Sequence, residues 1–173
     1  MWHWLFAIVS IFLLTREPLL KKQIVLYKQL IEKVGPVSAQ EYLKNSGLPF
    51  DGETHLLNHT VGDWLYDRYG AEGLKYCKDY FLSSCYHGFI IMAINRGGIS
   101  KLDEVIQHCR QQGPTVTIQC KHAMGHGFLA WLGYKNLPNA LDLCDQDYNC
   151  QDGVFMENLW AVHDGQKSPD QWL

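Results

Sequence analysis

Two pairs of histidines with the same spacing are the residues of this sequence best suited to chemistry. His55 and His59 form one pair, and His122 and His126 form the other. In both, a Trp-Leu pair begins five residues after the second histidine. On a helix, residues four apart share one face with Cβ atoms about 5–6 Å from each other, so two imidazoles can reach one metal ion. The repeated pattern therefore predicts metal binding by two similar helices.

A short pattern of Cys, any residue, His or Asp, and then a small residue occurs three times, 30–35 residues apart. The three copies are Cys85–Gly88, Cys120–Ala123 and Cys150–Gly153. This spacing is the length of a helix-pair repeat, and equivalent positions in a stacked array line one surface. We therefore expect five imidazoles to meet on one concave surface and to serve as metal ligands: His55, His59, His87, His122 and His126.

The ligand type limits the identity of the metal. Neutral imidazole suits transition metals, and we expect Zn, Cu or Fe. A carboxylate would complete the site, and Glu157 is the first candidate, as a ligand or as a general base. Asp152 is the second, and Asp63 is a further ligand candidate or a hydrogen-bond partner that orients an imidazole. The alternative is structural: the histidines cap helices and bond to backbone carbonyls. Non-covalent haem between two histidine helices is a minor option.

The six cysteines fall into three sequence-near groups at the expected helix junctions. The groups are Cys77 with Cys85, Cys109 with Cys120, and Cys144 with Cys150. Their even number and regular placement favour disulfides and an oxidising compartment, although six cysteines allow 15 connectivities. A thiolate metal site is the rival, but the sequence has no Cys-x-x-Cys. Free buried thiols in a cytosolic protein are the third interpretation.

Hydrophobic periodicity is helical along almost the whole chain. It predicts an amphipathic helix over 17–34, a short helix beginning near Ser38, and seven further helices over 53–69, 71–83, 86–97, 100–112, 119–134, 137–145 and 151–163. The connections are short, so neighbouring helices should pack antiparallel. The expected fold class is all-α, with helix hairpins stacked as a short solenoid or curved bundle and stapled by disulfides.

The N-terminal segment differs from the rest of the chain. Residues 1–14 are apolar and uncharged, which is short for a membrane span but suits the core of a signal peptide or a short anchor. We therefore divide the chain into residues 1–16, a signal peptide or membrane anchor, and a single helical-repeat domain over 17–173. A buried N-terminal helix is the alternative. The expected location is extracytoplasmic: periplasmic, secreted or membrane-anchored.

Composition narrows the class of protein. The 173 residues are 47% hydrophobic, and the formal net charge is −3 without a basic cluster, which argues for a globular protein and against nucleic acid as a partner. Motifs for nucleotide binding and serine hydrolysis are missing. The sequence predicts an extracytoplasmic metal-binding protein, either an enzyme that activates water or dioxygen, or a metal carrier without catalysis. A structural or interaction module with packed histidines is the third class, and no protein partner can be named.

Overall fold

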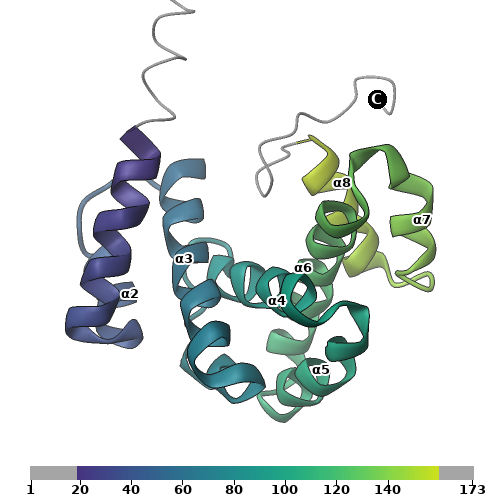
Figure 1. Ribbon diagram of the computed structural model, residues 1–173, viewed down its shortest axis with the longest axis horizontal. Helices are drawn as coiled ribbons and strands as arrows, with labels where there is room; N and C mark the ends of the chain where they lie inside the picture. Colours follow the sequence, from purple (N-terminus) through teal and green to yellow (C-terminus); the bar gives the residue numbers. More distant parts are fainter. Residues whose placement is uncertain (1–18, 160–173) are drawn as a thin grey trace, which may run out of the picture.

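The computed structural model describes residues 19–159, and these residues are almost entirely helical (Figure 1). The expected all-α class is confirmed for this part of the chain. The predicted signal or anchor over 1–16 lies outside the described residues, as do residues 160–163 of the last predicted helix. Within 19–159, every helix is too short or too polar to cross a membrane.

The α-helices are joined by turns, loops and short 3-10 helices. A first helix covers residues 19–34. After it come α2 (Pro36–Lys44), α3 (Gly52–Tyr69), α4 (Ser84–Gly97), α5 (Leu102–Gln111), α6 (Pro114–Leu132), α7 (Leu137–Asp142) and α8 (Tyr148–Leu159). Three 3-10 helices lie between them: η1 (Gly70–Tyr76), η2 (Ile99–Lys101) and η3 (Tyr134–Asn136).

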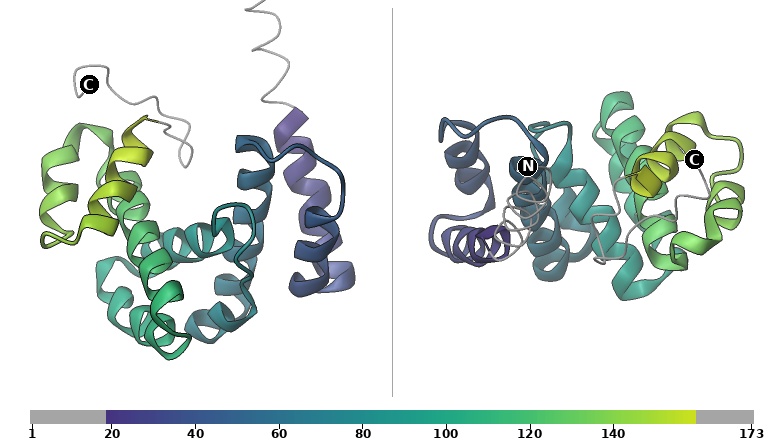
Figure 2. Two further views of the ribbon diagram at one scale, coloured as in Figure 1. Left: turned by 180° about the vertical axis from the view of Figure 1, so that it is seen from behind. Right: turned by 90° about the horizontal axis from the view of Figure 1, so that it is seen from above.

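Four of these helices form the framework of the molecule. α3 packs against α4, α4 against α6, and α6 against α8. In Figure 1, α4 crosses between α3 on one side and α6 with α8 on the other, and Figure 2 shows the same arrangement from behind. The first helix and α2 lie beside α3, and α5 covers the outside of the bend. α4 is buried on nearly every face, so it is the centre of the hydrophobic core.

Glycines allow α3 and α4 to approach until their backbones touch. A Cβ atom added at Gly62 would overlap the carbonyl oxygen of Cys85, and one added at Gly88 would overlap the carbonyl oxygen of His59. Both glycines lie inside helices, where glycine costs about 1 kcal/mol relative to alanine. This cost is offset by the close contact, which brings the histidine faces of the two helices together.

The pair α6 and α8 makes the same contact. A Cβ atom at Gly125 would overlap the carbonyl oxygen of Cys150, and one at Gly153 would overlap the carbonyl oxygen of His122. The residue spacings equal those of the first pair, with each glycine of the leading helix three residues after a histidine. The contacts therefore place His122 where His59 lies. If the two His-x-x-x-His segments are instead aligned on their Trp-Leu pairs, His122 corresponds to His55. The two alignments therefore differ by four residues, about one helical turn.

Three disulfides join neighbouring elements, in the pairs that sequence proximity suggests. They are Cys77–Cys85, Cys109–Cys120 and Cys144–Cys150, with sequence separations of 8, 11 and 6 residues. All six cysteines of the chain are therefore oxidised, which suits an oxidising environment. Each bridge closes a short loop before or within the first turns of α4, α6 or α8, three of the four framework helices.

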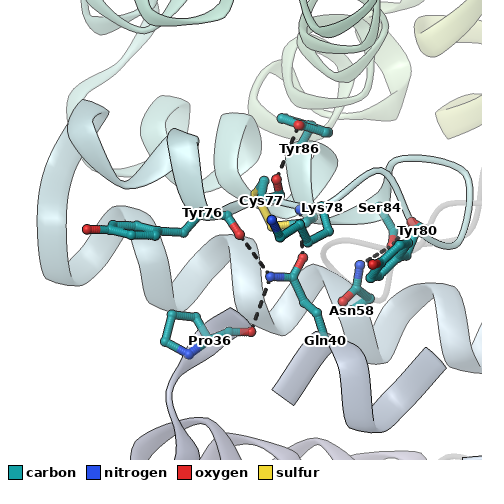
Figure 3. The surroundings of a disulfide bond; sticks show 10 residues. Pro36, Gln40, Asn58, Tyr76, Cys77, Lys78, Tyr80, Ser84 and Tyr86 are labelled. Atoms are coloured by element: carbon teal, nitrogen blue, oxygen red, sulfur yellow. Dashed lines mark hydrogen bonds between the residues drawn. A yellow bond between two sulfur atoms is a disulfide. The ribbon is translucent and has the colours of Figure 1, made fainter. Parts of the chain in front are cut away.

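The buried side chain of Gln40 attaches α2 to the first of these loops (Figure 3). Its Nε2 donates to the carbonyl oxygens of Pro36 and Tyr76 at 3.1 and 3.0 Å, and its Oε1 accepts from the backbone N–H of Lys78 at 2.9 Å. Tyr76 and Lys78 flank Cys77, so the hydrogen bonds of one side-chain amide hold the backbone on both sides of this disulfide cysteine.

One predicted helix, 71–83, is wrong. The chain forms the 3-10 helix η1 up to Tyr76 and then an irregular loop in which Phe81, Leu82 and Ser83 have positive φ angles of 52, 55 and 59°. The disulfide Cys77–Cys85 spans this loop and prevents a continuous helix. In addition, α6 begins at Pro114 rather than near 119, because Gly113 adopts φ 106° and a proline suits the first helical turn. The stacking of repeats as a solenoid stays a prediction.

Candidate metal centre

The structure brings all five predicted histidines together at the centre of the framework. His55 and His59 come from α3, His87 from α4, and His122 and His126 from α6. They form two groups of three in which one nitrogen of each ring lies within 4.8 Å of one nitrogen of the other two, and each group could hold a metal ion. We name His55, His59 and His87 the first triad, and His87, His122 and His126 the second triad.

Ring distances within both triads suit ligands of a shared ion. The centroid separations in the first triad are 4.6, 5.2 and 5.5 Å, and those in the second are 4.9, 5.0 and 5.1 Å. Imidazoles bonded to one tetrahedral ion at about 2.0–2.1 Å have ring centres about 5 Å apart. The side chains are therefore spaced as ligands without any movement of the helices.

Three of the histidines have their Nδ1 atom engaged outside the cluster. His55 Nδ1 lies 2.8 Å from the carbonyl oxygen of Phe81, His122 Nδ1 lies 3.1 Å from Asp152, and His126 Nδ1 lies 2.9 Å from Glu157. A backbone carbonyl and an ionised carboxylate accept hydrogen bonds, so with Asp152 and Glu157 ionised each of these Nδ1 atoms carries the proton. The lone pair of each ring is then on Nε2, and metal-binding histidines are oriented by outer acceptors in this manner.

Two of these lone pairs face each other. His122 Nε2 and His126 Nε2 are 3.1 Å apart, although both Nδ1 protons already have acceptors. Two neutral imidazoles in these tautomers cannot hydrogen-bond through Nε2, because neither nitrogen bears a proton. A cation shared by the two nitrogens would remove the repulsion, and ligand nitrogens on a tetrahedral ion are separated by about 3.3 Å.

The acceptor for His55 is held in an unusual backbone conformation. Phe81 begins the run of three left-handed non-glycine residues, a conformation that costs about 1–2 kcal/mol per residue. The disulfide at Cys85 and the hydrogen bond from Asn58 Nδ2 to Ser84 Oγ, 2.8 Å long, hold the end of this loop. Figure 3 shows Asn58 and Ser84 beside the disulfide. Strain of this kind is characteristic of functional sites, and here it aims one carbonyl at an imidazole.

The acceptor for His126 is a fully buried carboxylate. Glu157 on α8 has no exposed surface, and its Oε2 faces His126 while its Oε1 accepts the hydroxyl hydrogen bond of Tyr134 at 2.5 Å. A buried carboxylate is costly unless its oxygens receive donors, and both oxygens receive one here. A direct bond from Glu157 to a metal stays a prediction. The contacts that exist favour a positioning role through His126.

Burial keeps the central imidazoles in the form that binds metals. Burial, followed by the four neighbouring histidines, holds the pKa of His87 well below its usual range. Burial and the proximity of His126 also lower the pKa of His122, against the opposing effect of Asp152. Neutral imidazole is the form that binds metals, so both side chains could bind an ion without first losing the proton of an imidazolium.

A cavity of about 480 Å³ opens beside the cluster and is lined by one histidine of each triad. His55 and His126 reach it, and the rest of its wall is mainly apolar: Phe50, Leu56, Leu82 and Met156. The volume is within the range of small-molecule sites, which combine an apolar wall with a few polar groups.

Two contributors to the site had no signal in the sequence. The backbone carbonyl of Phe81 carries no side-chain signature, and Tyr134 lies after α6 outside any repeated motif. Asp152, expected as a second carboxylate ligand, contacts His122 from the half-exposed edge of the site. Of the three remaining histidines, His108 lies near Glu72 away from the cluster, and His3 and His163 are outside the described residues.

Comparisons with known proteins found no match to this chain among family models, curated proteins or solved structures.

Proposed function

We propose that this protein binds a transition-metal ion, Zn, Cu or Fe, in the histidine cluster. The observation that carries this proposal is the facing pair His122 Nε2 and His126 Nε2, whose Nδ1 protons are both taken by carboxylates. Simple packing of histidines would place donors against acceptors rather than two lone pairs against each other. Ligands from nitrogen alone suit these three metals better than Mg²⁺ or Ca²⁺, which prefer oxygen.

The oxidised cysteines support an extracytoplasmic location for this function. Three disulfides are typical of proteins in the periplasm or outside the cell. A signal peptide or anchor over 1–16 would deliver the chain there, and contact with a membrane through that segment is part of the same proposal.

Metal analysis of the purified protein tests the proposal. The wild-type protein, stripped with a chelator and titrated with Zn²⁺, should bind at least one ion per chain. His122→Ala and His126→Ala should each weaken binding about tenfold or more, since losing only an outer partner already costs 10–100-fold. His108→Ala is the matched control, because it removes a histidine outside both triads. Unchanged Zn²⁺ binding in both cluster variants would refute the proposal.

A second candidate function is metal-dependent catalysis on an apolar small molecule, and the cavity favours it over a carrier. A carrier needs ligands and an exit path, whereas the cavity beside His55 and His126 has room for an organic molecule next to the metal. A bound ion there would supply activated water or dioxygen. In this function Glu157 acts as a positioning residue that holds the His126 ring and its tautomer.

Activity against a series of acyl esters with increasing chain length tests the hydrolytic form of this candidate. The metal-loaded protein should hydrolyse longer apolar esters faster, and Leu82→Trp at the exposed edge of the cavity should reduce that preference without changing bound metal. An oxygen electrode with the same compounds tests the oxidative form. If the protein is fully loaded with metal but neither reaction is faster than with the free ion, the result would favour a metal carrier over an enzyme.

We also propose that α3 with α4 and α6 with α8 are two copies of one helix-hairpin unit. The equivalent glycine contacts support this, since Gly62 and Gly88 correspond to Gly125 and Gly153 in position and partner. In this arrangement each copy supplies imidazoles to the same centre.

A further inference from the structure

We infer that the cluster holds two metal ions bridged by the imidazole ring of His87, with Nδ1 bonded to the ion of the first triad and Nε2 to the ion of the second. This inference rests on the proposed metal binding and specifies its nuclearity and the ligand that connects the ions.

His87 is the member common to both triads, and it is the residue that α4 carries between α3 and α6. Its ring centre is 5.2 and 5.5 Å from those of His55 and His59, and 5.1 and 5.0 Å from those of His122 and His126. The ring is thus almost equally far from both histidine pairs, as expected for a bridge rather than for a ligand of one ion.

The two nitrogens of His87 have different surroundings. Nδ1 lies 3.3 Å from His55 Nε2, so this nitrogen faces the first triad. The other nitrogen, Nε2, is buried and makes no hydrogen bond within the described residues. Buried nitrogens without a partner are rare because each costs about 1–3 kcal/mol. Because Nδ1 already faces His55 and the two nitrogens lie on different edges of the ring, we assign Nε2 to the second triad.

Coordination through both nitrogens accounts for this arrangement. Each triad then provides three nitrogens to its own ion, which leaves a fourth position for water or a substrate, as catalytic metal sites require. Binding of the second ion removes the remaining N–H proton of His87 to solvent, and the ring becomes an imidazolate with one negative charge shared by two cations. The cavity lined by His55 and His126 reaches one ligand of each ion, so a single small molecule could contact both.

Titration of the metal-free wild-type protein with Cu²⁺ tests the inference, because two Cu²⁺ ions joined by an imidazolate couple their spins. The chain should bind two ions. The integrated electron paramagnetic resonance signal should rise to one spin per chain with the first equivalent and should be lost at low temperature when the second is bound.

His59→Ala provides the matched comparison, since it removes one ligand of the first triad and leaves the second complete. This variant should bind one Cu²⁺ with a full-intensity signal. His87→Gln should weaken both sites, whereas His108→Ala should behave as wild type. The wild-type titration decides the matter even if the His87 variant does not fold.

The outcomes separate the two proposals. No Cu²⁺ bound at micromolar concentration would overturn both the metal function and the bridge. One Cu²⁺ per chain, or two with two uncoupled spins, would overturn the bridge and leave the proposed metal binding intact.

Discussion

Replacing Glu157 by glutamine tests whether this carboxylate positions His126 as a ligand of the proposed metal. The carboxylate accepts from His126 Nδ1 at 2.9 Å and from the Tyr134 hydroxyl at 2.5 Å, and it has no exposed surface. Glutamine has nearly the same shape but only one accepting oxygen and no charge. The glutamine oxygen can therefore accept one of the two hydrogen bonds. Neither bond is then made to a charged acceptor.

The size of the effect follows from these contacts. Hydrogen bonds to charged groups contribute about 1.5–3 kcal/mol, so the free energy of unfolding of the metal-free variant should fall by about that amount. A weaker acceptor also makes the His126 ring less basic and less firmly oriented. Loss of such an outer partner lowers metal affinity by about 10–100-fold, or about 1.4–2.8 kcal/mol.

The assay is a competition titration of Zn²⁺ between the protein and a chromophoric chelator, with urea unfolding of the metal-free forms alongside. Asp152→Asn is the control, because Asp152 contacts His122 but is half exposed, so water can replace it. We expect its Zn²⁺ affinity to fall by less than that of Glu157→Gln. Equal affinity of Glu157→Gln and wild type would refute a positioning role for this carboxylate.

Two further predictions concern helix contact and acid stability. Gly88→Ala should destabilise the protein by about 1–3 kcal/mol in urea unfolding, because the new Cβ overlaps the backbone of His59, while Gly52→Ala, with open space around it, should change stability little. Acidification should destabilise the metal-free protein below pH about 6.5, since the unfolded chain then binds a proton at His87 that the folded chain, with its lowered pKa, does not. This histidine contributes up to about 1.4 kcal/mol per pH unit to the slope of the free energy of unfolding against pH. The His87→Gln variant should lack this contribution when urea unfolding is measured as a function of pH. An unchanged slope would contradict the argument from burial.

Local patterns were enough to predict much of the site. Helical spacing within His55–His59 and within His122–His126 was readable because residues four apart share a helix face whatever surrounds them. The grouping of the cysteines was readable because the members of each group are near in sequence, whereas the pairing itself was one of 15 connectivities and came from the structure. The prediction of a helix over 71–83 was wrong because it used only the hydrophobic periodicity of that segment. This periodicity carries no information on the Cys77–Cys85 bridge or on the left-handed residues of the loop that the bridge closes.

By itself the sequence determined the helical class, the three sequence-near groups of cysteines and the identity of five histidines able to meet. Only the tertiary structure decided that His87 lies between the other two pairs, and that Phe81, Asp152 and Glu157 hold the outer nitrogens of their partners. The physical reason is that these relations depend on how closely separate helices approach. That approach is set by glycine contacts between α3 and α4 and between α6 and α8, across segments distant in the chain.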